Sequence, residues 1–223
     1  MRIIVTGATG MVGIELVRQA IADSSIDEVT VLVRRKMPFS DPKLREVIHR
    51  DFCCFNGLEE IFSRADACFW CLGISQLRVS KKEYINITYR YTVKAAEAMR
   101  RANPSLRFIF LSAMGADMSG RWPGRFAKVK GRTEKTLADM GFPGLFIFHP
   151  GGILPSVPQQ QMSRFKKFEL FMVRLLSFAA PFAVVSTVRL TKAMLSVLKQ
   201  DPGKMIIRHR EIRRLSQSCR YTP

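Results

Sequence analysis

Three glycines close to the N-terminus have the spacing of a phosphate-binding turn. The stretch "TGATGMVG" follows the strand-like "RIIV" of residues 2–5 and leads into a helical pattern that starts near Met11. Glycines allow the backbone to turn tightly and to approach a pyrophosphate, and the N-terminus of the helix offers free N–H groups with a partial positive charge. A structural glycine turn is the alternative, but the position between a strand and a helix favours dinucleotide binding. The residues expected to contact the dinucleotide in this turn are Gly7, Thr9, Gly10, Met11, Val12 and Gly13.

The end of the second expected strand indicates which dinucleotide fits. An acidic residue at this place would accept hydrogen bonds from the ribose hydroxyls of NAD. This chain instead has "VLVRRK", with Arg34, Arg35 and Lys36. Cations bind a 2′-phosphate, so the sequence predicts NADP (NADPH) as the cofactor, with Arg34 and Arg35 among its ligands. A solvated basic strand end in an already basic protein is the alternative.

Three later turns are expected to complete the cofactor site. After the third strand, Asp51 can accept a hydrogen bond from the adenine amino group while Phe52 packs beside the ring. Pro150 and Gly151 follow the sixth strand, beside the expected nicotinamide pocket. The turn after the fourth strand is expected to pass close to the adenosine ribose and the pyrophosphate, and it consists of Cys71, Leu72 and Gly73.

Short β-branched runs alternate with helical patterns over the first 150 residues. The helical patterns cover 11–22, 81–102 and 125–140, where apolar residues recur three and four positions apart. Strands spaced by helices predict an α/β protein, a doubly wound parallel-sheet Rossmann fold whose sheet is covered on both faces. The strands are expected at 2–5, 29–33, 46–49, 67–71, 107–111 and 144–148.

The pattern loosens beyond residue 150. A loop rich in Pro, Gly and Gln precedes helical patterns at 164–180 and 189–199 and a last strand-like run at 204–208. We therefore expect a single domain, 1–223, in which 1–150 is the cofactor-binding core and 151–223 is a C-terminal region that covers the substrate. The apolar run 170–186 is too short and too interrupted for a membrane span of roughly 20 residues. Core packing is its common explanation, and a hydrophobic substrate or a dimer contact is the alternative.

The composition is that of a globular protein with one substantial core. The 223 residues are 47% hydrophobic and 24% charged. The chain opens on a strand-like run without the features of a secretory signal, so we expect a cytoplasmic protein. Cys68 and Cys71 have CxxC spacing, but they lie in a buried strand-like run rather than at a helix start. No metal site is therefore predicted.

A formal net charge of +18 is the extreme feature of the composition. Residues 157–223 carry 13 Lys and Arg against 3 Asp and Glu, with basic runs at 164–168 and 208–214. Such a density of positive charge favours anionic partners of any kind. Because no motif for reading nucleic acid accompanies it, no specific nucleic acid is predicted. The expected partner is a small-molecule substrate, bound by a monomer or a homodimer.

Segments spread over most of the chain resemble the atypical short-chain dehydrogenases/reductases, whose fingerprint is TGxxGxxG at the N-terminus. Within that family the chain is most similar to the Tat-interacting-protein branch of NADPH-binding oxidoreductases and to small proteins labelled nucleoside-diphosphate-sugar epimerases. The resemblance is carried by "TGATGMVG", "VLVRR", "FWCLGIS", "YINITYRYTVKAAEAM", "FIFLSAMGAD", "KVKGRTEKTL", "FHPGGIL" and "VRLTKAMLSVL".

The resemblance implies a catalytic Tyr-x-x-x-Lys motif with an upstream Ser or Thr. Residues four apart lie on one helix face, where the lysine holds the nicotinamide ribose and lowers the pKa of the tyrosine. The phenol then exchanges a proton with the substrate oxygen. Here the motif falls on Phe126 and Lys130, so the lysine is kept and the ionisable phenol is missing. The upstream hydroxyl is Ser112, although the alignment with Ala113 is an alternative.

Other polar groups near this motif are candidates for replacing the phenol. His149 lies in "HPGG", where relatives often have arginine, and an imidazole there could transfer protons. A structural histidine is the commoner alternative. Lys128 points to another helix face and is expected to be solvated. Three tyrosines follow the fourth strand and are expected to pack, namely Tyr84, Tyr89 and Tyr91.

Two functions are consistent with these features. The first is an unusual NADPH-dependent reductase or epimerase-like enzyme that uses Ser112, Lys130 and His149. The second is a catalytically inactive protein that senses the redox state through NADP(H) and signals to a partner. A third, association with nucleic acid through the basic C-terminal region, is supported by charge alone.

Overall fold

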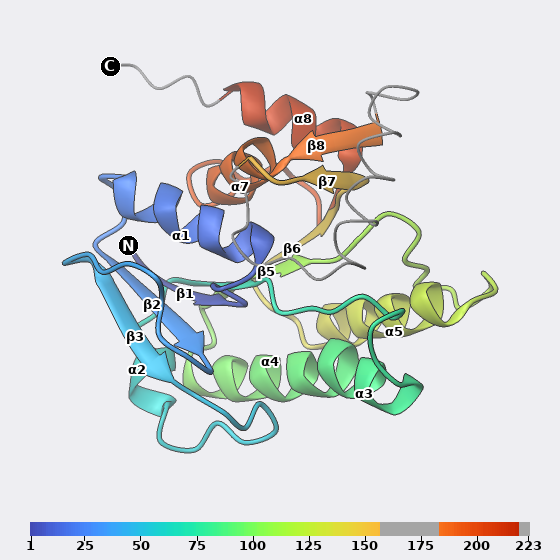
Figure 1. Ribbon diagram of the computed structural model, residues 1–223, viewed down its shortest axis with the longest axis horizontal. Coiled ribbons are helices and arrows are strands. Elements are labelled where there is room, and N and C mark those ends of the chain that lie inside the picture. Colours follow the sequence, from blue (N-terminus) through green and yellow to red (C-terminus); the bar gives the residue numbers. More distant parts are fainter. Residues whose placement is uncertain (157–182, 219–223) are drawn as a thin grey trace.

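The computed structural model describes residues 1–156 and 183–218. Seven strands form one parallel sheet in the order β3-β2-β1-β4-β5-β6-β9, and helices lie on both sides of it (Figure 1). The predicted Rossmann fold is thus confirmed. The strands are β1 (Arg2–Thr6), β2 (Glu28–Val33), β3 (Leu44–Ile48), β4 (Ala67–Trp70), β5 (Arg107–Leu111), β6 (Gly144–His149) and β9 (Ile206–Arg208).

The strands in the middle of the sheet are buried on both faces, as their apolar runs predict. All four residues of β4 are buried, and β1, β2 and β6 are buried at every position but one. Thr6 of β1 pairs with Leu32 of β2 and with Trp70 of β4. The segments that follow these strands therefore leave the sheet side by side. The strand order reverses between β1 and β4, which is where open α/β sheets bind their ligands.

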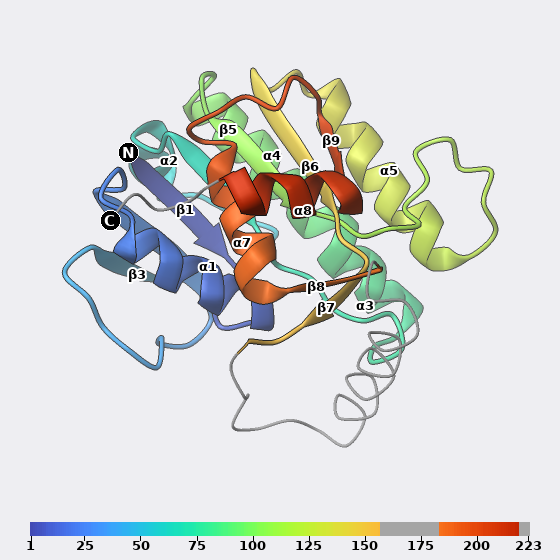
Figure 2. The ribbon, with the colours of Figure 1, turned by 90° about the horizontal axis from the view of Figure 1, so that it is seen from above.

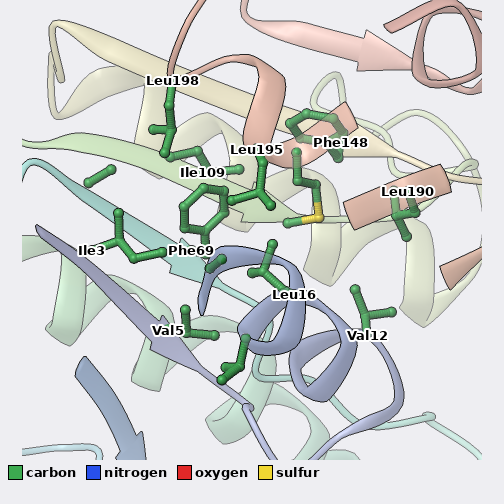
Figure 3. Close-up of a cluster of buried hydrophobic side chains, with 14 of the residues drawn as sticks. Ile3, Val5, Val12, Leu16, Phe69, Ile109, Phe148, Leu190, Leu195 and Leu198 are labelled. Carbon is green, nitrogen blue, oxygen red and sulfur yellow. The ribbon is translucent and has the colours of Figure 1, made fainter. Parts of the chain in front are cut away.

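Each face of the sheet has its own layer of helices and its own apolar core (Figures 1 and 2). One layer contains α1 (Met11–Ala22), α7 (Thr187–Ser196) and α8 (His209–Ser218), and the other contains α2 (Glu59–Ser63), α4 (Tyr91–Ala102) and α5 (Arg125–Asp139). Figure 3 shows the first core, in which Ile3 and Phe69 of the sheet face Leu16 of α1 and Leu190 of α7. Burial of each such side chain contributes roughly 1.5–3 kcal/mol to stability.

The helix expected over 81–102 has a π-helical turn in its middle. The segment consists of α3 (Lys81–Ile85), the π turn η1 (Asn86–Arg90) and α4. The carbonyl oxygen of Thr88, inside this turn, accepts hydrogen bonds from the hydroxyls of Thr92 at 2.9 Å and Thr133 at 3.3 Å. The two threonine hydroxyls thus satisfy a carbonyl of the wider π turn, and the bond from Thr133 links this turn to α5.

The region after residue 150 adds to the same sheet and to its cover. The expected strand at 204–208 is β9, which pairs with β6, and the expected helix at 189–199 is α7. The sequence patterns missed α2, the pair of β7 (Gly152–Leu154) with β8 (Val184–Ser186), and the helix α8, which contains the basic run 208–214 except Arg208. The helix expected at 164–180, the basic run 164–168, most of the apolar run 170–186 and Cys219 lie outside the described residues.

The cysteines of the CxxC spacing, a buried Cys68 and a partly buried Cys71, are poorly suited to redox chemistry. Burial raises the pKa of the Cys68 thiol well above its ordinary value and that of Cys71 to about 12. Because the thiolate is the reactive form, neither thiol is activated at neutral pH. Within the described part of the chain, no helix is long and apolar enough to cross a membrane.

Candidate active site

The turn between β1 and α1 has a geometry that requires its glycines. Gly7 has a φ of 65°, and a Cβ on it would lie 2.6 Å from the carbonyl oxygen of Cys71. A Cβ on Gly13 would lie 2.2 Å from the carbonyl oxygen of Gly7, which also accepts a hydrogen bond from the Gly10 N–H at 2.8 Å. Larger residues would therefore force the turn, the helix and the β4 turn apart.

The N-terminus of α1 is open to an anion. Gly10, its N-cap, is exposed and provides no side-chain cap, and the first turn has no acidic residue. The N–H groups of the first helical turn, which have no partner within a helix, can therefore bind a phosphate with the favourable helix dipole. A strand, a glycine turn and an uncapped helix N-terminus in this order suit the pyrophosphate of a dinucleotide.

The cations predicted to select NADP lie where a dinucleotide ribose is expected. Arg34, Arg35 and Lys36 directly follow β2 and all three are exposed. Since β2 is paired with β1, this basic segment leaves the sheet beside the glycine turn. The NADP preference itself stays a prediction.

The residues predicted to surround the adenosine differ in their exposure to solvent. The Asp51 carboxylate is exposed, and its Oδ1 accepts the Cys53 N–H at 2.9 Å. Phe52 is only 3% exposed and packs among aromatic rings, with Trp70 at a centroid distance of 6.2 Å, so it offers an adenine ring little free surface. The turn after β4 does approach the glycine turn, through the carbonyl of Cys71, and continues into a partly exposed Leu72 and an exposed Gly73.

Lys130 lies at the carboxyl end of β5, on α5. Its Nζ donates a hydrogen bond to the carbonyl oxygen of Leu111 at 3.2 Å and lies 5.1 Å from the centroid of the Phe110 ring. Burial lowers the pKa of the Lys130 ammonium to about 8, although the negative charge of Glu134 opposes this shift. Lys128 is exposed, as expected for the other helix face.

Ser112 and His149 are joined by a buried carboxylate that the sequence patterns did not reveal. The Ser112 Oγ donates a short hydrogen bond to Oε1 of Glu134, and Nε2 of His149 lies 2.9 Å from the same oxygen. Glu134 is fully buried, and its other oxygen, Oε2, has no hydrogen-bond partner among the described residues. We call Ser112, Lys130, Glu134 and His149 the polar cluster.

A local signal for Glu134 exists in the sequence. The buried stripe of α5 includes Ala127, Gly131, Glu134 and Leu137, so this acid lies on the apolar side of the helix. It also follows Lys130 by four residues, which places both on one helix face. A carboxylate at a core position is rare unless it is paired, so an acid on this stripe indicates a buried carboxylate with polar partners.

Ser112 therefore has a different contact from the one predicted for it. Its only proton is donated to Glu134, so a substrate oxygen cannot receive that proton while this bond is held. The predicted role of Ser112 in orienting a substrate stays a prediction, whereas its contact with Glu134 is structural. Phe126, four residues before Lys130, is partly buried.

Pro150 and Gly151 connect the end of β6 to neighbouring elements. The Pro150 carbonyl accepts the Met114 N–H at 2.9 Å, and the Gly151 N–H donates to Nδ1 of His209 at 3.0 Å. The backbone donor of Gly151 is thus already used, and proline has none. Any hydrogen bond of these two residues to a cofactor would have to use their carbonyl oxygens as acceptors, and such a contact stays a prediction.

The three tyrosines pack, as expected. Tyr84 is 1% exposed and burial raises its pKa, Tyr91 lies 5.9 Å from the Phe52 ring, and Tyr89 carries the guanidinium of Arg132 at 4.2 Å from its ring centroid. A buried phenol with a raised pKa is a weak proton donor at neutral pH, so Tyr84 is a poor replacement for the missing tyrosine.

The sequence is similar to a protein family and to known proteins over much of its length. A family model described as NAD(P)H-binding matches residues 7–143. Protein HTATIP2 of Rattus norvegicus is 27% identical over 204 residues, which make up 90% of this chain and 82% of that protein. The mitochondrial protein FMP52 of Candida albicans is 30% identical over 160 residues, or 69% of this chain and 68% of that protein.

Solved structures with a similar fold include sugar-nucleotide epimerases. UDP-glucuronic acid 4-epimerase from Bacillus cereus, in complex with NAD, superposes with a TM-score of 0.68 at 14% identity, over 93% of this chain and 76% of that one. UDP-glucose 4-epimerase from Thermotoga maritima, with UDP-glucose, gives 0.69 at 14% identity, over 98% and 82%. Identities this low show a shared fold.

Proposed function

This chain belongs to the NAD(P)H-binding family of atypical short-chain dehydrogenases/reductases, and from that premise we propose that it is an NADPH-dependent oxidoreductase. It acts on a carbonyl or hydroxyl group of a small molecule, in a single reduction or in an epimerase-like sequence. The observation that carries the proposal is the polar cluster, because it gathers a partly buried lysine, a buried carboxylate and an imidazole at the carboxyl ends of β5 and β6.

Each part of the dinucleotide has residues suited to hold it. The turn from Gly7 to Gly13 and the N-terminus of α1 would hold the pyrophosphate, Arg34 and Arg35 the 2′-phosphate, and Lys130 the nicotinamide ribose. When bound, the nicotinamide supplies or accepts the hydride. The ammonium of Lys130 would donate hydrogen bonds to the ribose hydroxyls, which fixes the ring beside the polar cluster.

Turnover of NADPH with a panel of quinones, aldehydes and keto compounds tests the proposal. We expect slow oxidation of NADPH with at least one of them, and faster oxidation by Phe126→Tyr, because this substitution restores a phenol one helical turn before Lys130. A general acid contributes about 10² to 10⁴ in rate where no other group donates the proton, and this is the upper bound of the gain. Lys128→Gln, on the exposed face of the same helix, is the matched control and should change nothing.

The preference for NADP over NAD has its own test. Arg34→Asp should weaken NADPH binding by about tenfold or more, since one charge-assisted hydrogen bond is lost and a repulsive charge is gained, and NADH binding should weaken much less. Equilibrium titration of both dinucleotides measures this difference. Equal affinities of the wild-type protein for NADPH and NADH would contradict the preference.

A second candidate function is favoured by one observation, the Phe126 side chain, which has no proton to exchange. In this alternative the chain binds NADP(H) without turnover and signals its occupancy to a partner. Tight NADPH binding, no turnover by the wild type with any substrate and no gain in Phe126→Tyr would favour it over the enzyme. We also propose a substrate with an apolar part, because the run 170–186 is apolar, and a cytoplasmic location.

A further inference from the structure

Glu134 is the centre of the polar cluster and faces groups from three elements. Lys130 lies one helical turn before it on α5, Ser112 follows β5, and His149 ends β6. These are the charged and titratable groups that the described structure places around it. A fully buried carboxylate is costly unless donors and cations compensate for its lost hydration, and the two donors on Oε1 and the nearby ammonium do so.

Ser112, directly after β5, and His149, at the end of β6, lie side by side at the same edge of the sheet. β5 and β6 are in register with Leu111 opposite Phe148, and the Ser112 N–H donates to the Phe148 carbonyl at 2.9 Å. The Leu111 carbonyl accepts a hydrogen bond from the ammonium of Lys130. The His149 ring is therefore part of the same cluster as the lysine that is expected to hold the nicotinamide ribose.

The contact between His149 and Glu134 determines which ring nitrogen is free. A carboxylate accepts hydrogen bonds only, so Nε2 of His149 must carry a proton to make the 2.9 Å contact. In the neutral ring, Nδ1 is then the unprotonated nitrogen and the site of proton exchange. The His149 side chain is 13% exposed, so solvent can still reach the ring to restore a proton.

We propose that Glu134 is a positioning residue that holds His149 in its Nε2–H form, and that Nδ1 of His149 transfers the proton that a phenol at position 126 would otherwise transfer. This inference rests on the proposed function. The carboxylate fixes the ring orientation and the tautomer, and it stabilises the imidazolium, which is the logic of carboxylate–histidine pairs in general.

The proton balance of the step is simple. In reduction, the carbonyl oxygen takes the proton from Nδ1 of the His149 imidazolium while the carbonyl carbon gains the hydride, so the product is an alcohol and His149 is left neutral as its Nε2–H form. A proton from solvent then restores the imidazolium. In oxidation, neutral Nδ1 accepts the hydroxyl proton instead. Glu134 keeps its hydrogen bond with Nε2 throughout and exchanges no proton.

The tautomer can be measured without turnover, because the chain has only three histidines. Nitrogen NMR of protein labelled at histidine distinguishes the two ring nitrogens, and His149→Asn identifies the signals of His149. His209 is an internal reference of the same form, since its Nδ1 accepts the Gly151 N–H. In the wild type at high pH we expect His149 as the Nε2–H form alone.

Glu134→Gln is the decisive variant, since it keeps the shape and removes the charge. A glutamine presents an amide N–H as readily as a carbonyl, so we expect a mixture of His149 tautomers and an unchanged His209. Asp139→Asn, an equivalent change at an exposed position of the same helix, should leave both histidines unchanged. Glu134→Asp, which withdraws the carboxylate by one methylene, serves if the glutamine variant does not fold. A His149 that remains purely the Nε2–H form in both variants would overturn the positioning role.

Turnover then tests the proton transfer. With a substrate found for the wild type, we expect His149→Asn to lower kcat by about 10² or more while the affinity for NADPH is kept, and Glu134→Gln to lower kcat by a smaller factor. The double variant Phe126→Tyr with His149→Asn should recover turnover. Unchanged kcat in His149→Asn would overturn the role of Nδ1. If the wild type turns over nothing, the proposed function has failed, and the NMR measurement still decides whether Glu134 fixes the ring.

Discussion

At the scale of single residues, the polar cluster places Lys130 where burial lowers the pKa of its ammonium. Burial holds the pKa of Lys130 at about 8, below its ordinary value of 10.5. Between these two values the unfolded chain binds more protons than the folded protein. The contribution of Lys130 to the free energy of unfolding therefore rises with pH from about 8 to 10.5.

The same shift makes cofactor binding depend on pH. One N–H of Lys130 is donated to the Leu111 carbonyl, so only the protonated ammonium has two further donors for the ribose hydroxyls. The affinity for NADPH should therefore fall by roughly tenfold as pH rises through about 8, the loss of one charge-assisted hydrogen bond. Titration of NADPH at pH values on either side of 8 measures this fall. Lys130→Met should bind more weakly at every pH and show no such step, and equal slopes in the two proteins would contradict the assignment.

Ser112 offers a test of the buried carboxylate as a structural element. Ser112→Ala removes a donor from a fully buried acceptor, and we expect it to lower the free energy of unfolding by about 1–3 kcal/mol in urea denaturation. Ser119→Ala is the matched control, because its hydroxyl also donates to a carboxylate, that of Asp117, but in an exposed loop. The control should cost clearly less. Equal losses would mean that burial of Glu134 adds nothing to the bond.

The residues found from the sequence are those with a local signature. The glycine turn, Arg34 and Lys130 belong to short motifs whose chemistry is readable within a few positions. Glu134 does not, because its partners come from β5 and β6, which are 22 and 15 residues away and meet it only in the folded sheet. Its place on the buried stripe of α5 indicated a core acid without indicating its partners.

At the scale of elements, α5 and the loop before it pack closely because Gly131 has no side chain. A Cβ on Gly131 would lie 1.8 Å from the carbonyl oxygen of Asp117, so the loop passes directly over the helix next to Lys130. The Asp117 N–H also donates to the Ala127 carbonyl at 3.2 Å. The loop position is thus tied to the helix that carries the polar cluster.

Gly131→Ala should therefore destabilise the protein, although alanine favours a helix over glycine by about 1 kcal/mol. The clash is with backbone, which cannot move without the loop, so we expect a net loss of about 1–3 kcal/mol and weaker NADPH binding through Lys130. Thermal unfolding and NADPH titration measure the two effects. Gly73→Ala, which meets no atom within 4 Å, is the control for stability. A more stable Gly131→Ala protein would show that the loop yields easily.

Helix periodicity predicted the long elements and missed the irregular ones for a physical reason. The apolar spacing over 81–102 is judged across several helical turns, so a single π-helical turn at Asn86–Arg90 does not interrupt the helical pattern. The helix α2 and the strands β7 and β8 have only five and three residues, which is too short for a period to repeat. The helix α8, which contains most of the basic run 208–214, packs on the sheet because Ile212 reaches the core, a contact that composition alone does not reveal.

At the scale of the whole molecule, the seven-stranded sheet contains strands from both sides of the predicted division at residue 150. β9 completes the sheet beside β6, and α7 and α8 cover the same face as α1 (Figure 2). The fully buried side chains of this part include four large apolar ones, namely Leu190, Met194, Ile207 and Ile212. Their burial amounts to roughly 6–12 kcal/mol, which is comparable with the whole stability of a typical domain, about 5–15 kcal/mol.

A chain that ends at residue 150 should therefore fail to fold on its own, even though it keeps the glycine turn and Lys130. We expect no cooperative unfolding transition and no stabilisation by NADPH, because the loss of α7 and β9 exposes the core around Leu16 and Phe148. In the full chain, Leu190→Ala should lower the free energy of unfolding by about 2–5 kcal/mol, while Arg189→Ala, its exposed neighbour in α7, should stay within about 0.5 kcal/mol. A truncated chain that unfolds cooperatively and binds NADPH would instead show that the first 150 residues form an independent cofactor-binding unit.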